Sequence, residues 1–207
     1  MKLTTITHVS VDGVMQGLGG SDEDRRGGFD RGGWALSVFN NDDEATTFVD
    51  QVFQRAGAFL FGRRTYEIFA GSWGAIAEMR GQPIGVALNE TPKYVASTTL
   101  TDPRWANTTV LSRDVEAAIG ELTAKPGGEL QVHGSGALVR RLFETQLVDE
   151  IILLTYPVVI GQGTRLFPDM GPDIALDLVD SRATSKGITI QVYRPAGPPQ
   201  YATATAD

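Results

Sequence analysis

This chain of 207 residues has no cysteine and only two histidines. Disulfides and thiolate chemistry are therefore excluded, and a metal site built from histidines is not expected. Positive charge is also scarce, because the net charge of −7 leaves an acidic molecule. Nucleic acid and anionic membranes both favour a basic face, so neither is an expected partner. A small molecule remains as the expected ligand.

Long apolar runs are missing as well. No stretch approaches the length of a membrane-spanning helix, and the first residues, MKLTTITHVSVDG, lack the apolar core of a signal peptide. A cytoplasmic location is therefore expected. The hydrophobic content of 42% is typical of a globular protein, and we expect one domain over residues 1–195. Residues 196–207 show no core pattern and are expected to be a disordered tail.

Apolar patterns with strand and helix periods alternate along the chain. Strands are expected at residues 3–11, 58–61, 93–97, 108–111, 129–133, 149–159, 175–183 and 187–194, and helices near 44–56, 64–69, 83–89, 115–122 and 138–143. This order predicts an α/β fold with a mixed, mostly parallel sheet, helices on both faces and a C-terminal antiparallel hairpin. Ligands of such sheets bind outside the carboxyl ends of the strands. The long glycine-rich loop at 12–34 is typical of a functional loop.

The segment FLFGRRTYE at residues 59–67 joins an apolar strand directly to a helix. Arg63 and Arg64 fall in the first helical turn, where the helix dipole disfavours cations unless an anion joins them. Backbone N–H groups at a helix start also suit a phosphate. The segment therefore fits a phosphate clamp, formed by Arg63 and Arg64. It also fits an ordinary surface turn whose arginines pair with acidic residues 22–24.

A second strand-to-helix turn reads GSGALV at residues 134–139. Gly134 and Gly136 would let the backbone approach a pyrophosphate closely. The third glycine of the Rossmann fingerprint is absent, since residue 139 is valine, so a Rossmann domain is not expected. A tight turn that needs glycine for its backbone conformation is the alternative.

Five motifs together resemble a known family. They are HVSVDG at 8–13, FGRRTYE at 61–67, the strand end at 97–99, HGSGALV at 133–139 and LVDEIILLTYPVVIGQGTRLF at 147–167. The chain resembles the dihydrofolate reductase-like superfamily, and within it the reductase domain of the bifunctional deaminase-reductase of riboflavin biosynthesis. The resemblance spans nearly the whole chain. It implies a mixed sheet with flanking helices, a bound NADPH and a homodimer.

The resemblance also implies roles for individual residues. Residues 63–65 would hold phosphates of the adenosine half, residues 97 and 98 would lie beside the 2′-phosphate, and residues 134–138 would wrap the pyrophosphate. Residues 9 and 10 would line the nicotinamide side, with the loop 12–34 as a lid. The implied cofactor-binding residues are Val9, Ser10, Gly62, Arg63, Arg64, Thr65, Ser97, Thr98, Gly134, Ser135, Gly136, Ala137 and Leu138.

Candidates for a catalytic proton donor are fewer and less specific. Asp12, Asp30 and His133 are the catalytic candidates, with His8 and Glu44 as alternatives. Asp12 also fits a local hydrogen-bonding role in its Asp-Gly turn. Asp30 also fits a solvated loop position, and His133 also fits a hydrogen-bonded structural histidine.

The chain departs from the riboflavin-pathway reductase at two of these motifs. That resemblance would lead us to expect a glutamate-bearing turn where His133 and Gly134 stand, and basic residues after the Asp-Gly turn, where Val14 and Met15 occur. We therefore expect an NADPH-dependent reductase of a small planar heterocycle such as a pterin or a pyrimidine. The alternatives are a 5-amino-6-(5-phosphoribosylamino)uracil reductase and a non-catalytic NADPH-binding protein.

Overall fold

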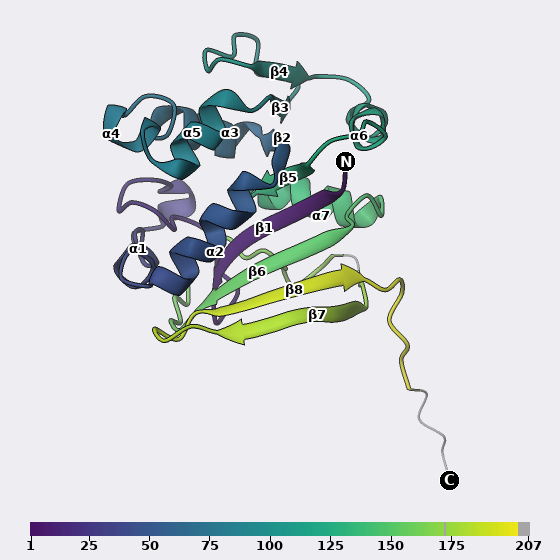
Figure 1. Ribbon diagram of the computed structural model, residues 1–207. Coiled ribbons are helices and arrows are strands. Elements are labelled where there is room, and N and C mark those ends of the chain that lie inside the picture. The colour runs from purple at the N-terminus through teal and green to yellow at the C-terminus, as the bar shows by residue number, and fades with distance from the viewer. Residues whose placement is uncertain (172, 203–207) are drawn as a thin grey trace.

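The computed structural model describes residues 1–171 and 173–202. In this part of the chain, eight strands form one sheet in the order β4-β3-β2-β5-β1-β6-β8-β7 (Figure 1). The strands are β1 (Leu3–Ser10), β2 (Ala56–Gly62), β3 (Lys93–Ala96), β4 (Thr108–Leu111), β5 (Glu129–His133), β6 (Glu150–Tyr156), β7 (Leu176–Ala183) and β8 (Thr189–Pro195). The pairs among β1 to β6 are parallel, whereas β8 is antiparallel to both β6 and β7. The predicted mixed sheet with a C-terminal hairpin is confirmed.

Helices cover both faces of the sheet (Figure 1). They are α1 (Leu36–Phe39), α2 (Asp43–Gln54), α3 (Arg63–Gly71), α4 (Ala77–Arg80), α5 (Pro83–Glu90), α6 (Val115–Thr123) and α7 (Gly136–Glu144), with a 3-10 turn at Arg26–Gly28. Side chains of α2, α3 and α5 share one core with Phe59 and Phe61. Side chains of α6 and α7 share the other core with Ala58 and Leu60. The two cores therefore follow the two-residue alternation of the strands.

Local sequence explains where the long helix α2 begins. The Asp42 carboxylate accepts a hydrogen bond from the Ala45 N–H, and Asp43 and Glu44 place negative charge in the first turn. Both features stabilise a helix start. Val49 and Val52 then recur at helical spacing and are buried against the sheet.

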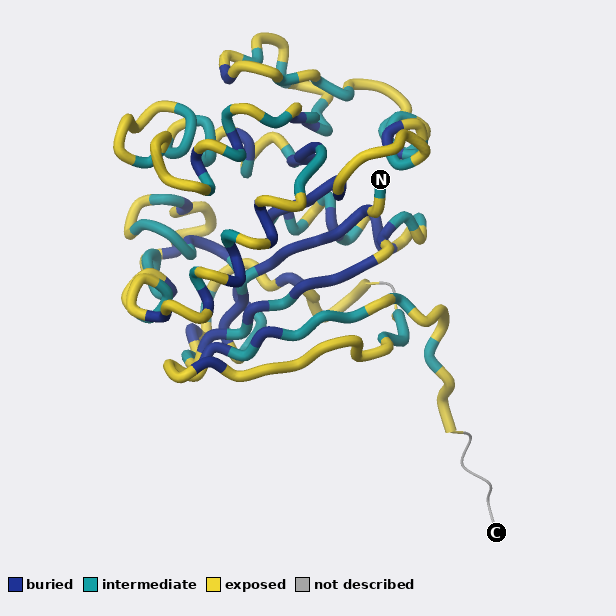
Figure 2. Tube along the Cα trace, in the orientation of Figure 1, coloured by how far each residue is buried: buried dark blue, intermediate teal, exposed yellow. Residues whose placement is uncertain are grey.

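Three segments differ most from the expectation. The strand expected at 149–159 ends at Tyr156, because Pro157 has no backbone N–H to continue the ladder. The short helices α1 and α4 were not expected, since each has four residues and too little pattern to detect. Figure 2 shows that β7, one of the two edge strands of the described sheet, is exposed along most of its length, while the central strands are buried.

The end of the chain is described up to residue 202. Ala196 and Gly197 exchange hydrogen bonds with Ala175, and residues 203–207 of the expected tail lie outside the described residues. No helix in the described part of the chain is long and apolar enough to cross a membrane.

Candidate functional site

A large cavity lies at the carboxyl ends of the central strands. Its volume is about 1260 Å³, which exceeds the roughly 300–1,000 Å³ of a site for one small ligand. Strands β1, β2, β5 and β6 bring His8, Gly62, His133 and Tyr156 to its wall. The helices α1 to α5, the helix α7 and residues 15–24 also contribute to the wall. The cavity therefore lies at the edge of the sheet where the sequence predicts a ligand site.

The two strand-to-helix turns singled out in the sequence meet in this cavity. The Gly62 N–H donates to Ser135 Oγ at 3.0 Å, and the Ser135 N–H donates to Thr65 Oγ1 at 3.1 Å. These bonds hold the start of α3 against the start of α7. The N–H donors of two helix starts therefore lie on one wall, as binding of a phosphate chain requires.

Arg63 and Arg64 lie in the first turn of α3, as the sequence predicts, and both line the cavity. Arg63 donates to Glu67 Oε1 at 2.7 Å and to Thr99 Oγ1 at 2.8 Å. Arg64 lies 3.7 Å from Asp24 Oδ1. The pairing with acidic residues 22–24, one of the two interpretations left open by the sequence, is thus present for Arg64, whereas Arg63 pairs with Glu67 of its own helix. The Arg64 side chain remains 44% exposed, so it is still accessible to an anion.

Glycine keeps the second turn open. Gly134 has φ of +56°, a conformation that L side chains rarely adopt. A Cβ on Gly136 would approach Met15 Sδ to 2.7 Å and Arg140 Nη1 to 3.3 Å. With two arginines and two exposed helix starts nearby, this chemistry fits the phosphates of a dinucleotide. Ala137 and Leu138 also line the cavity.

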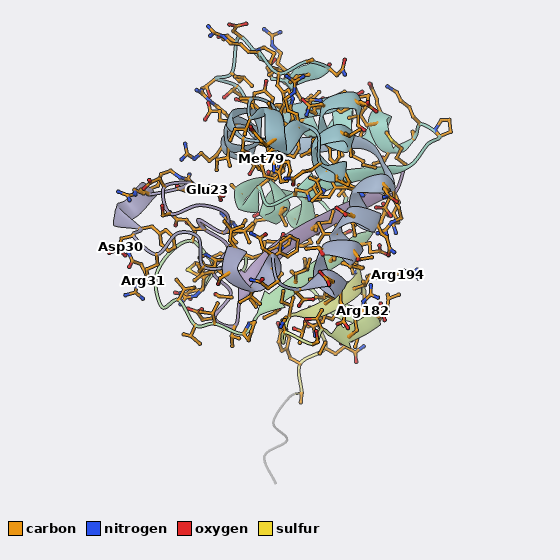
Figure 3. The ribbon with its side chains drawn as sticks, turned by 60° about the vertical axis from the view of Figure 1, so that its left-hand side comes forward. Glu23, Asp30, Arg31, Met79, Arg182 and Arg194 are labelled. Atoms are coloured by element: carbon orange, nitrogen blue, oxygen red, sulfur yellow. The ribbon has the colours of Figure 1, made fainter. Side chains whose placement is uncertain are left out.

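Part of the loop at 12–34 forms a wall of the cavity. Gln16 holds the loop in place, because its side chain donates to the carbonyls of Asp24 and Arg26 and accepts from the Thr164 N–H at 2.9 Å. Burial raises the pKa of Glu23, whose carboxylate accepts from the Gly19 N–H. Figure 3 shows Glu23 below Met79 of α4, and both residues line the cavity.

The two aspartates considered for catalysis do not line the cavity. Asp12 Oδ1 accepts from Ser10 Oγ at 2.7 Å and from the Ile160 N–H at 2.9 Å, and Oδ2 accepts from the Gly161 N–H at 2.8 Å. These hydrogen bonds, that of Ser10 above all, lower the pKa of Asp12 to about 2. Asp30 is exposed on the outer side of the loop, beside Arg31 (Figure 3). Neither position gives the carboxylate access to a ligand in the cavity.

Four residues expected near the cofactor also lie outside the cavity wall. Val9 is buried in the core on the opposite face of the sheet, and the Ser10 hydroxyl is bonded to Asp12 and to the Val14 N–H. Ser97 and Thr98 follow β3, where Ser97 Oγ accepts from the N–H of Leu100. The segment after this strand contacts the clamp through the Arg63–Thr99 hydrogen bond.

Histidine 8 and Tyr156 form a polar pair on the cavity wall. His8 Nδ1 lies 2.8 Å from Tyr156 Oη, although the residues are 148 positions apart. The His8 ring also meets Phe39 edge-on, with ring centroids 5.8 Å apart. Burial lowers the pKa of His8 to about 4 and raises the pKa of Tyr156. Both side chains are therefore uncharged at neutral pH.

His133 also lines the cavity, but its ring is held by the protein. Gln131 donates through Nε2 to Val52 O and Glu129 Oε2, which leaves its Oε1 to accept from His133 Nε2 at 3.0 Å. The ring stacks on Phe53 at 4.2 Å between centroids. Burial, and then the proximity of His8, lower the pKa of His133 to about 3. These contacts match the structural interpretation of this histidine.

Sequence reasoning assigned no role to Tyr156 or Met79, and it treated residues 17–24 of the cavity wall only as part of the expected lid and as partners of the arginines. Tyr156 is the last residue of the apolar strand β6. Its position at the carboxyl end of a strand was the signal that could have placed it at the ligand site. The loop and α4 carry no periodic pattern that could have placed them. Among the described residues, no group of three or more acidic or histidine side chains could hold a metal ion.

The sheet order, the flanking helices and the cavity at the strand ends are those of the dihydrofolate reductase-like superfamily. The chain belongs to the family described as RibD C-terminal domain, whose model matches residues 1–190. Membership of this family indicates a reductase of the riboflavin-pathway type that uses a nicotinamide cofactor.

Individual relatives share this fold over most of the chain. The uncharacterized protein YyaP of Bacillus subtilis (strain 168) is 26% identical over 191 residues, covering 89% of this chain and 90% of that protein. The structure of a putative riboflavin biosynthesis protein from Shewanella sp. PV-4 has a TM-score of 0.71 at 22% identity, covering 94% of this chain and 99% of that one. A pyrimidine reductase-like protein from Corynebacterium diphtheriae NCTC has a TM-score of 0.62 at 13% identity, covering 94% of this chain and 91% of that one. At these identities the two structures establish a common fold only.

Proposed function

We propose that this protein is an NADPH-dependent reductase that transfers a hydride to a small planar heterocycle such as a pterin or a pyrimidine. The observation that carries the proposal is the convergence of two helix starts with Arg63 and Arg64 on one cavity. When bound, NADPH supplies the hydride, and the heterocycle takes up a proton with it. The protein binds and orients both molecules and excludes water from them.

The cofactor would occupy the part of the cavity near α3 and α7. Arg63 and Arg64 would bind phosphates of the adenosine half, and the turn at 134–138 would lie along the pyrophosphate. Arginine favours NADPH over NADH, because a 2′-phosphate is held by planar cationic donors and a free ribose hydroxyl by an acidic residue. Each arginine already has an acidic neighbour, Glu67 for Arg63 and Asp24 for Arg64, and each side chain remains 44% exposed to a phosphate.

Two alternative functions are supported by individual observations. A 5-amino-6-(5-phosphoribosylamino)uracil reductase is supported by the family and by the structural likeness to a putative riboflavin biosynthesis protein. A non-catalytic NADPH-binding protein is supported by the absence of Asp12 and Asp30 from the cavity wall. The homodimer and the cytoplasmic location expected from the sequence stay predictions.

The proposal is tested by fluorescence titration of the purified protein with NADPH and, separately, with NADH. We expect NADPH to bind more tightly, and we expect the Arg63→Ala/Arg64→Ala variant to lose about 10- to 100-fold in NADPH affinity with a smaller loss for NADH, since hydrogen bonds to charged groups contribute about 1.5–3 kcal/mol.

Arg104→Ala is the matched control, because Arg104 is exposed and pairs only with Asp102 among the described residues. Equal binding of both nucleotides, or an unchanged affinity in the double variant, would show that the arginines do not read the 2′-phosphate. Absence of binding to the folded protein would overturn the proposal as a whole.

A further inference from the structure

Charge is distributed unevenly over the wall of the cavity. Every charged residue on the wall belongs to residues 22–26, to α3 or to α7. Strands β1 and β6 and helices α1, α2 and α5 also line the cavity and contribute no charged side chain. The cavity thus has a charged half, which contains the clamp, and an uncharged half, which we call the inner chamber.

The inner chamber is formed by His8, Tyr156, Ile6, Phe39, Val49 and Phe53. Its apolar members belong to or pack against the core between the sheet and α2. Rings from four different segments therefore line this part of the cavity, which suits a flat and mostly apolar ligand.

The arginines that line the cavity all lie in its charged half. Arg26 donates to both carboxylate oxygens of Asp24, at 2.8 and 2.6 Å. Arg140 lies against Gly136 at the start of α7, and Arg63 and Arg64 lie at the start of α3. Strand β2, which leads into α3, is two strand positions from β1 and three from β6, or roughly 10 and 14 Å at the usual strand spacing. Among the described residues, those that line the inner chamber include no cation to pair with a phosphate.

The His8–Tyr156 pair offers the same two groups to a ligand in either arrangement of its hydrogens. If the Tyr156 hydroxyl donates to His8 Nδ1, the ring keeps an Nε2–H donor and the phenol oxygen keeps a lone pair. If His8 Nδ1–H donates to the phenol oxygen, Tyr156 keeps its O–H donor and Nε2 keeps a lone pair. One donor and one acceptor therefore remain, and neither depends on charge. A lactam edge, N–H beside C=O, complements such a pair.

We propose that the inner chamber binds an uncharged planar heterocycle through its lactam edge, that the His8–Tyr156 pair selects this edge, and that substrates bearing a phosphate are disfavoured. The inference rests on the proposed function, because the cofactor is assigned to the charged half. It argues against the phosphoribosylamino-uracil as the substrate, since burying a phosphate without a cation or sufficient donors is costly.

The first test uses fluorescent probes and the unmodified protein saturated with NADP⁺. Riboflavin and flavin mononucleotide carry the same ring and the same lactam edge, and only the second carries a phosphate. Lumazine is a smaller uncharged ring with a lactam edge. We expect riboflavin or lumazine to bind at least about tenfold more tightly than flavin mononucleotide, which corresponds to about 1.4 kcal/mol. Equal or tighter binding of flavin mononucleotide, or no binding of either uncharged probe, would overturn the inference.

The second test removes one hydroxyl. Tyr156→Phe should weaken binding of the preferred uncharged probe by about tenfold, because the pair loses one polar group. Tyr193→Phe is the control, since Tyr193 packs on the opposite face of the sheet. Unchanged probe affinity in Tyr156→Phe would overturn the role of the pair. NADP⁺ titration of each variant separates these results from a failure of the proposed function, which would abolish nucleotide binding in the unmodified protein.

Discussion

Asp12 uses both carboxylate oxygens to hold the main chain at residues 160 and 161. Its pKa is low because hydrogen bonds stabilise the charged form, led by that from Ser10. A proton donor needs a pKa closer to the working pH and access to substrate. Asp12 has neither, so its side chain joins the first strand to the segment after β6. The structural interpretation of the Asp-Gly turn therefore describes its contacts better than the catalytic one.

Replacing Asp12 tests this interpretation. Asp12→Asn keeps the shape but presents an amide N–H₂ to a backbone donor, so we expect the free energy of unfolding to fall by about 1–3 kcal/mol. NADPH affinity should change by less than about twofold, as for other substitutions away from a site. Urea unfolding and the fluorescence titration measure the two effects.

Asp30→Asn is the control, because that carboxylate is exposed and lies 3.9 Å from its nearest ionic partner, Arg31. A stable Asp12→Asn protein that binds NADPH but reduces nothing would instead identify Asp12 as catalytic.

Helix and strand boundaries follow local chemistry closely. Strand β2 and helix α3 meet at Gly62, as the apolar run and the helical pattern predict, and β6 ends before Pro157. The contact at the C-terminal end of α5 is made instead by a side chain of the following strand, Lys93. Lys93, the first residue of β3, is fully buried, and its Nζ donates to Leu88 O at 2.6 Å and to Thr91 O at 3.0 Å. A buried ammonium thus satisfies carbonyls at the end of a helix, where cations are favoured.

Lys93→Met keeps much of the side-chain volume and removes the three N–H donors. We expect the free energy of unfolding to fall by about 1–3 kcal/mol, because two carbonyls lose their shared partner. Lys186→Met is the matched control, since Lys186 is exposed in the turn before β8. Denaturant midpoints of the two variants should differ clearly. Equal midpoints would show that water replaces the ammonium without cost.

The whole molecule keeps both of its histidines in the interior. Burial lowers the pKa of His8 to about 4 and that of His133 to about 3, from an ordinary value of 6.5. Below pH 6.5 the unfolded chain binds protons that the folded protein does not bind. Stability is therefore complete above pH 6.5 and is lost progressively as the pH falls through 6.5 toward the folded-state pKa values.

We expect urea unfolding at pH 7.5, 6 and 5 to show this loss. Each unit of pKa shift corresponds to about 1.4 kcal/mol, so several kcal/mol should be lost once both groups are considered. Carboxylates with low pKa values, such as Asp12, add to this loss of stability only at lower pH, where they become protonated in the unfolded chain. In the His133→Gln variant, the number of protons taken up on unfolding between pH 6 and 5 should be smaller by about one. The same slope in the variant and the original protein would contradict this explanation.

The sequence alone determined the order and type of the main elements and the two turns that meet in the cavity. Periodicity and glycine positions are local properties, and the parallel order of strands brings their carboxyl ends to one edge. Tertiary structure decided which polar groups face the ligand. The pairing of His8 with Tyr156, of Arg64 with Asp24 and of Asp12 with residue 160 joins distant parts of the chain. Such pairs depend on strand register and on the path of the 12–34 loop, which no local pattern specifies.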